Sequence, residues 1–176
     1  MNIFEIHKIG FGWFEVCFTP HAEKQGWLIN SDYLCCEAPT IFLDCLADIF
    51  DGKSKEEWQC WQDEPGAYIL HMELVEGKLL VEIFGSKSDS EYLKVDRGKS
   101  LMSEVDELIY RDTFEPQYLL DDVITQFSLY ENGNGLRLYE KHWGKFPKVE
   151  YHRLRKCAAE INNTLDKYSK MFCFKY

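Results

Sequence analysis

The sequence predicts a single α+β domain over residues 1–176, with a mainly antiparallel sheet of about five or six strands and about three or four helices packed on one side of it. Three observations predict this class. Several short segments alternate apolar and polar side chains between turn residues, which is typical of antiparallel strands. Other segments repeat apolar residues at helical spacing. The 176 residues are 45% hydrophobic and 15% aromatic, and a chain of this length buries about 70% of its unfolded surface.

The first predicted elements are two strands and a helix. Residues 12–19, GWFEVCFT, alternate as a strand does, and residues 27–34, WLINSDYL, are expected to form the returning strand. Pro39 then opens a helix, because proline is tolerated in the first helical turn, and Gly52 follows the helix as a stop. The apolar residues at helical spacing in this segment are Phe42, Leu43, Leu46, Ile49 and Phe50.

The middle of the chain is predicted to form an antiparallel meander. Residues 57–62 are an edge strand, and Glu64-Pro65-Gly66 carries proline and glycine where a hairpin turn accepts them. Residues 68–74 alternate cleanly. A tight turn at Glu76-Gly77 then leads into a strand at 79–84.

A second interpretation of the start of this meander remains open. Ser54 and Glu57 match a capping box, which would begin a helical turn. That turn would place Trp58 and Trp61 on one face. The hairpin is the preferred interpretation.

The remainder of the chain is predicted to contain one more strand and several helices. Residues 85–100 are polar and contain glycine, which indicates a loop. Residues 103–114 alternate around apolar side chains and are expected to form the last strand, and Thr113 is the expected N-cap of the helix after it. The helices predicted from there on are 114–130, a short piece at 136–143, and 148–168.

Charge is distributed unevenly along the chain. The formal net charge is −10, and nucleic acid is not an expected partner because its binding relies on lysine and arginine. Acidic residues concentrate in 37–64 and 104–122, whereas residues 137–156 are mainly basic. Two interpretations remain open. The opposite charges neutralise one another within the chain, or the acidic, aromatic segments bind a basic protein.

Cysteine usage and hydropathy predict a cytoplasmic protein. The seven cysteines form no CxxC motif, and Cys17, Cys45 and Cys157 fall at apolar positions where a reduced thiol behaves as a small hydrophobe. The start of the chain lacks the pattern of a signal peptide. No apolar run approaches the length of about 20 residues that spans a membrane.

Signatures of catalysis are weak. Carboxylates near Trp58 and Trp61 could form an acid/base pair, but carboxylates that flank a turn are usually solvated. Nucleophile elbows and phosphate-binding loops do not occur. The sequence therefore predicts no enzyme, no cofactor and no metal ion. The alternatives are a small hydrolase or ligand-binding protein that uses His71 with Glu73, or a structural subunit of a larger assembly.

Two stretches resemble known patterns. Residues 61–84, WQDEPGAYILHMELVEGKLLVEIF, are similar to a hairpin of small bacterial proteins, and residues 132–154, NGNGLRLYEKHWGKFPKVEYHRL, resemble a second pattern found there. Some such proteins look like immunity proteins of polymorphic-toxin or contact-dependent inhibition systems. The resemblance implies a cytoplasmic binding protein without a cofactor, and it carries over no catalytic residue.

The leading hypothesis is therefore an acidic protein-binding module, and in particular an immunity protein that occludes a basic toxin domain. In this hypothesis aromatic side chains supply the binding energy and carboxylates speed the encounter. The residues predicted to contact the partner are Glu56, Glu57, Trp58, Trp61, Asp63 and Glu64, with Asp44 and Asp48 nearby.

Overall fold

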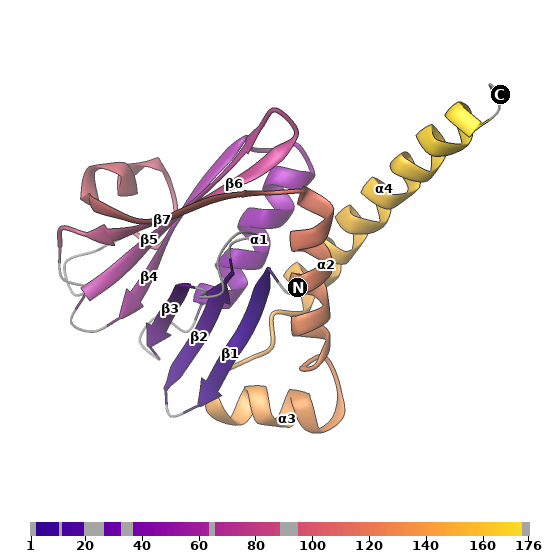
Figure 1. Ribbon diagram of the computed structural model, residues 1–176. Helices are drawn as coiled ribbons and strands as arrows, with labels where there is room; N and C mark the ends of the chain where they lie inside the picture. Colours follow the sequence, from indigo (N-terminus) through magenta and orange to yellow (C-terminus); the bar gives the residue numbers. More distant parts are fainter. Residues whose placement is uncertain are drawn as a thin grey trace.

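The computed structural model describes residues 3–10, 12–19, 27–32, 37–63, 66–88 and 95–173 (Figure 1). Its strands form two antiparallel sheets. The first sheet consists of β1 (Phe4–Gly10), β2 (Trp13–Phe18) and β3 (Trp27–Asp32), and the second of β4 (Glu56–Asp63), β5 (Gly66–Val75), β6 (Lys78–Ser86) and β7 (Val105–Phe114). The helices are α1 (Ala38–Phe50), the 3₁₀-helix η3 (Lys99–Glu104), α2 (Pro116–Ser128), α3 (Gly133–His142) and α4 (Lys148–Cys173).

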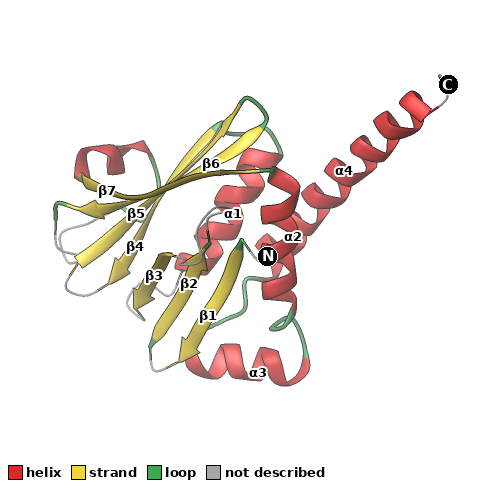
Figure 2. Cartoon of the chain, in the orientation of Figure 1, coloured by secondary structure: helices red, strands yellow, loops and turns green. Residues whose placement is uncertain are grey.

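The α+β class is confirmed, but the prediction of a single sheet is wrong. The strands are divided into a three-stranded sheet, in the order β1-β2-β3, and a four-stranded sheet, in the order β4-β5-β6-β7. β3 lies beside β4 without being its hydrogen-bonded neighbour, and α1 connects the two sheets along the chain. Figure 2 shows the strands on one side of the molecule and α2 and α4 on the other, with α1 between them and α3 below the end of the three-stranded sheet.

Strand β1 was not predicted, and the reason lies in its register. Its pairing with β2 shifts between Ile6 and Lys8. An irregularity of this kind interrupts the alternation of side chains that identifies a strand in a sequence. Phe4 and Ile6 are buried on one face before the shift, while Ile9 is half-buried after it.

The predicted hairpin is confirmed in its strands, and the helical alternative is wrong. β4 pairs with β5 from Glu56↔Glu73 to Asp63↔Gly66, whereas residues 64–65 of the predicted turn lie outside the described residues. The next turn is as predicted. Glu76 and Gly77 have φ values of 51° and 81°, as a two-residue hairpin loop with positive φ at both central positions requires.

Two predictions that concern the region around β7 are wrong. Thr113 belongs to β7, and the N-cap of α2 is Glu115, whose side chain makes no capping hydrogen bond. The predicted loop at 85–100 is partly regular, because β6 continues to Ser86 and Arg97 forms a bridge with Gln59 of β4. Residues 89–94 of that loop, and residues 33–34 of the predicted second strand, lie outside the described residues.

One hydrophobic cluster joins both sheets and all four α-helices. Phe14 of β2 lies at its centre, with ring centroids 6.3 Å from Trp61, 6.3 Å from Phe127 and 5.4 Å from Trp143. A second, smaller cluster covers the other face of the four-stranded sheet and includes Leu101 of η3. The helices are therefore not all on one side, since η3 packs on the face opposite the main core.

The last helix is the longest. α4 has 26 residues, and its C-terminal half extends away from the rest of the molecule (Figure 1). Within the described ranges, no helix is both long and apolar enough to cross a membrane.

Candidate functional site

The acidic residues predicted to bind a partner include a group on α1 and β4 that Arg97 contacts. The guanidinium of Arg97 donates to Glu57 Oε2 over 2.9 Å and to Asp44 Oδ2 over 2.7 Å. It also forms an ion pair with Asp48. Arg97 precedes η3 along the chain, so this segment is tied to both α1 and β4.

A second arginine reaches the same carboxylates from α4. Arg153 donates to Asp51 Oδ2 from Nε over 2.9 Å, and to Asp44 and Asp48 over 2.5 Å each. The thiol of Cys157, one turn further along α4, donates to Asp51 Oδ1 over 2.9 Å. The carboxylates of α1 therefore form the seam between α1 and α4. We call Asp44, Asp48, Asp51, Glu57, Arg97 and Arg153 the arginine clamp.

The arginine clamp favours the ionised forms of Asp48 and Asp51. Burial alone would raise the pKa of Asp48, but hydrogen bonds from Arg153 and Arg97 outweigh it, so the pKa lies below its usual value. The pKa of Asp51 is lowered by the hydrogen bond from Cys157 and, despite some burial, by the one from Arg153. For these residues the carboxylates are paired with cations of the same chain, in line with the first of the two charge interpretations, although four carboxylates share two guanidinium groups.

The two tryptophans predicted as partner contacts are buried. Trp61 is 0% exposed in the main core, with its ring centroid 6.1 Å from that of Phe42. Trp58 is 7% exposed and stacks on His71 at 4.0 Å. Residues three apart on a strand point to opposite faces, so these two rings cannot belong to one surface. The prediction that both are exposed anchors is wrong.

The remaining predicted contact residues lie along β4 and just after it. Glu56 forms an ion pair with Lys99 and accepts a hydrogen bond from Trp58 Nε1 over 3.3 Å. Asp63 is half-buried at the end of β4. Glu64 lies outside the described residues. The structure thus brings Glu57, Asp44 and Asp48 together, but around arginines of the same chain.

A row of polar side chains crosses the four-stranded sheet. Trp58, His71, Glu82 and Arg111 are direct cross-strand neighbours on β4, β5, β6 and β7. His71 Nδ1 lies 2.7 Å from Glu82 Oε2, and Nε2 lies 3.4 Å from a carboxylate oxygen of Glu56. Arg111 Nε donates to the other oxygen of Glu82 over 2.6 Å.

This row does not support the alternative of a hydrolase that uses His71 with Glu73. The carboxylates that contact the imidazole belong to Glu82 and Glu56 rather than to Glu73. His71 is only 5% exposed, and the Trp58 ring covers one of its faces. Within the part of the chain that the structure describes, no group of three or more histidine, cysteine or acidic residues is arranged to hold a metal ion.

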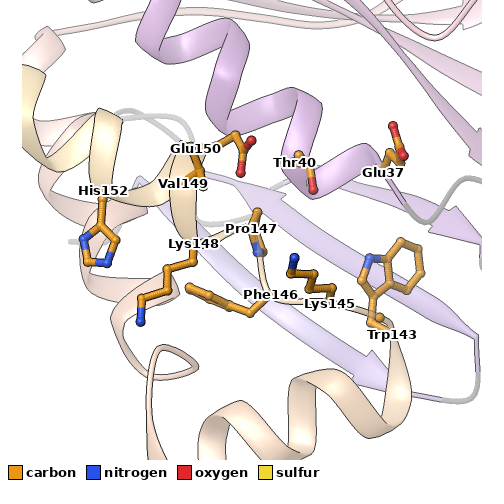
Figure 3. Close-up of a pocket in the computed structure, with 11 residues that line it drawn as sticks. Glu37, Thr40, Trp143, Lys145, Phe146, Pro147, Lys148, Val149, Glu150 and His152 are labelled. Carbon is orange, nitrogen blue, oxygen red and sulfur yellow. The ribbon is translucent and has the colours of Figure 1, made fainter.

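A pocket of about 780 Å³ lies between the first turn of α1 and the segment that leads into α4 (Figure 3). Trp143, Phe146 and Pro147 give it an apolar lining. Its charged side chains have both signs, since Lys145 and Lys148 lie on the same wall as Glu150 and opposite Glu37. A pocket of this size can hold a small molecule, but its mixed charges do not select one chemical class.

Strand β7 carries two exposed acidic side chains whose surroundings differ from those of the carboxylates in the arginine clamp. It is the end strand of the four-stranded sheet, and Asp106 and Glu107 are exposed on it. No lysine, arginine or histidine of the described ranges pairs with either carboxylate. Leu108 beside them is 46% exposed. We call Asp106, Glu107 and Leu108 the β7 patch. It combines unneutralised negative charge with an apolar side chain.

Comparison with known proteins adds no relative, because no family model, no curated protein and no solved structure matches the chain. The resemblance of residues 61–84 and 132–154 to immunity proteins therefore stays a prediction. What the chain does must be argued from its own residues, and the β7 patch is a site where two adjacent exposed carboxylates form no ion pair with a described residue.

Proposed function

We propose that the chain is an acidic protein-binding protein that receives a basic partner on the β7 patch, and that it acts as an immunity protein which covers a toxin domain. The observation that carries this proposal is the contrast between two acidic groups. The carboxylates of α1 are paired with Arg97 and Arg153, whereas Asp106 and Glu107 are exposed and form no ion pair with a described lysine, arginine or histidine.

Charge and apolar area have separate roles in this proposal. A formal net charge of −10 attracts a basic protein over a distance of about 10 Å at physiological salt, and unpaired carboxylates at the contact site raise the association rate. Burial of exposed apolar area such as that of Leu108 slows dissociation. Occlusion of a toxin in this way requires no chemical step.

The proposal is tested by affinity purification of the tagged chain from a lysate of the source organism. The variant is Asp106→Lys/Glu107→Lys. The matched control is Glu5→Lys/Glu140→Lys, which makes the same change of net charge at exposed positions on β1 and α3. We expect the wild type and the control to retain one basic protein in equal amounts, and the β7 variant to retain at least about tenfold less.

Two results would contradict the proposal. One is that the wild type retains no protein above the level of an empty resin. The other is that the β7 variant retains the same partner as well as the control does, because the unneutralised carboxylates would then have no part in binding.

A further inference from the structure

We infer that β7 binds its partner by strand addition, so that an extended basic segment of the partner pairs with the free edge of β7 and lengthens the four-stranded sheet. The inference rests on the proposed function and specifies how the same site works. Strand addition is a common mode of peptide recognition, in which backbone hydrogen bonds supply affinity and side-chain contacts supply specificity.

Two other sheet edges, those of β4 and β1, are covered within the chain. Along β4, the backbone N–H of Cys60 donates to Asp96 over 2.9 Å, and the N–H of Gly98 donates to the carbonyl of Trp58 over 2.9 Å. The segment around Arg97 therefore acts as an additional strand on that edge.

At β1, side chains of α2 accept hydrogen bonds from the backbone. Asp122 accepts from the N–H of Ile3 over 2.5 Å, and Gln126 accepts from the N–H of Ile6 over 3.2 Å. These contacts occupy donors that a foreign strand would need.

The free edge of β7 can be located from its hydrogen bonds. In an antiparallel pair, every second residue directs its backbone N–H and C=O away from the neighbouring strand. The N–H of Thr113 donates to the side chain of Asp112 over 2.7 Å, so it points away from β6. By the same alternation the N–H and C=O of Arg111 also point away from β6, opposite its partner Glu82. The N–H of Thr113 is occupied by Asp112, and the register with β6 shifts twice before Tyr110. The part of the edge that is open to pairing is therefore centred on Arg111.

The charges of β7 select a basic segment. Asp106 and Glu107 are both exposed near the start of β7, where its register with β6 shifts. A lysine or arginine of an added strand meets a carboxylate at this end of β7. Arg111 does not offset this charge, because its guanidinium is bound to Glu82.

A second copy of the chain is the wrong occupant for this edge. Each copy carries a formal net charge of −10 and the same acidic strand, so pairing of two β7 edges brings like charges together. Charges on an edge strand oppose self-association, and β7 carries exposed acidic residues. Charge leaves pairing with a strand of opposite charge favourable.

The test uses the full chain and four capped ten-residue peptides. The first alternates lysine and valine, the second has the same sequence with every backbone nitrogen methylated, and the third replaces lysine by glutamate. The fourth replaces lysine by serine. Binding is followed by NMR titration, and solvent exchange of the Arg111 amide reports pairing at the β7 edge. We expect the lysine–valine peptide to slow Arg111 exchange at least about tenfold at saturation, and the methylated peptide to bind at least about tenfold more weakly.

The other outcomes contradict either strand addition or the charge preference of β7. If the methylated peptide binds as tightly as the lysine–valine peptide, the inference of strand addition is wrong. Charge-guided docking, and thus the proposed function, would be unaffected. If the glutamate or serine peptide binds as tightly as the lysine–valine peptide, β7 has no preference for basic segments. The proposed function depends on that preference and would then be wrong too. A lysine–valine peptide that leaves Arg111 exchange unchanged overturns strand addition at this edge. Slow Arg111 exchange that depends on protein concentration without peptide identifies a second copy as the occupant and overturns the inference.

Discussion

At the scale of single residues, Gly135 has the least room of any described glycine. A Cβ at this position would lie 1.8 Å from the carbonyl oxygen of Leu129, although Gly135 is inside α3. The chain therefore passes very close to the end of α2 as it begins α3. Alanine is the better helix former by about 1 kcal/mol, but the steric conflict with a backbone atom outweighs that preference.

We predict that Gly135→Ala lowers the free energy of unfolding by about 1–3 kcal/mol, as overpacking does. Gly144→Ala is the control, because a Cβ there meets no atom within 4 Å, and we expect a change within about 0.5 kcal/mol. Urea denaturation of both variants measures the difference. Equal stabilities would contradict the close approach of Gly135 to α2.

Single residues also show how far the candidate site could be predicted. Asp44 and Asp48 were predicted to lie near Glu57, and the structure brings these carboxylates together, while their contact with a partner stays a prediction. The partners were missed, because Arg97 lies in a segment whose polar composition predicted a loop, and Arg153 is separated from Asp44 by 109 residues. Contacts between such distant positions leave no spacing pattern in one sequence.

At the scale of elements, the arginine clamp fixes α4 against α1. Arg153 has 23% of its side chain exposed, and Asp48 and Asp51 have 19% and 27%. Solvent therefore screens these ion pairs only in part, so their effect on stability lies between that of a surface pair and that of a buried one.

We predict that Arg153→Met lowers the free energy of unfolding by about 1–2 kcal/mol at neutral pH, because it removes one of the two guanidinium groups that hold the carboxylates of α1 close together. Lys156→Met is the control, since Lys156 is 80% exposed and pairs only with an exposed Glu160, and we expect a change within about 0.5 kcal/mol. Thermal or urea unfolding at low salt measures both. A control that loses as much stability as Arg153→Met would contradict the special role of the arginine clamp.

The same contacts set an acid dependence with a defined sign. The pKa values of Asp48 and Asp51 are lowered from 3.8 in the folded protein, so unfolding takes up protons. Their stabilising contribution is complete above the unfolded value and is lost as the pH falls through the folded values. We predict that wild-type stability decreases from about pH 4 downward, and that Arg153→Met shows a shallower decrease over this range. Parallel acid profiles for the two proteins would contradict this origin.

Elements were predicted well where a pattern is local. The alternation of β5 and the Glu76-Gly77 turn depend on neighbouring residues, and both are as expected. β1 was missed because a register shift interrupts its alternation. The division into two sheets was not predictable either, because the choice between hydrogen-bonded and merely adjacent strands, as for β3 and β4, depends on tertiary packing.

At the scale of the whole molecule, the net charge conceals two different uses of acidic residues. Some of the carboxylates pair with arginines in the arginine clamp and between Glu82 and Arg111, and these ion pairs hold elements together. Another part is exposed on the β7 patch. Composition predicted an acidic binding protein, but only the arrangement in space separates the carboxylates that are neutralised internally from those that a partner can reach.

The most direct measurement of the central claim is the association rate constant between the chain and the partner that it retains, followed by stopped flow over a range of salt concentrations. For the wild type and for Glu5→Lys/Glu140→Lys, we predict a rate that falls at least about tenfold between about 20 mM and 500 mM salt. For Asp106→Lys/Glu107→Lys, we predict a rate that is already slow at low salt and changes little. If the β7 variant instead associates as fast as the wild type at every salt concentration, β7 does not receive the partner.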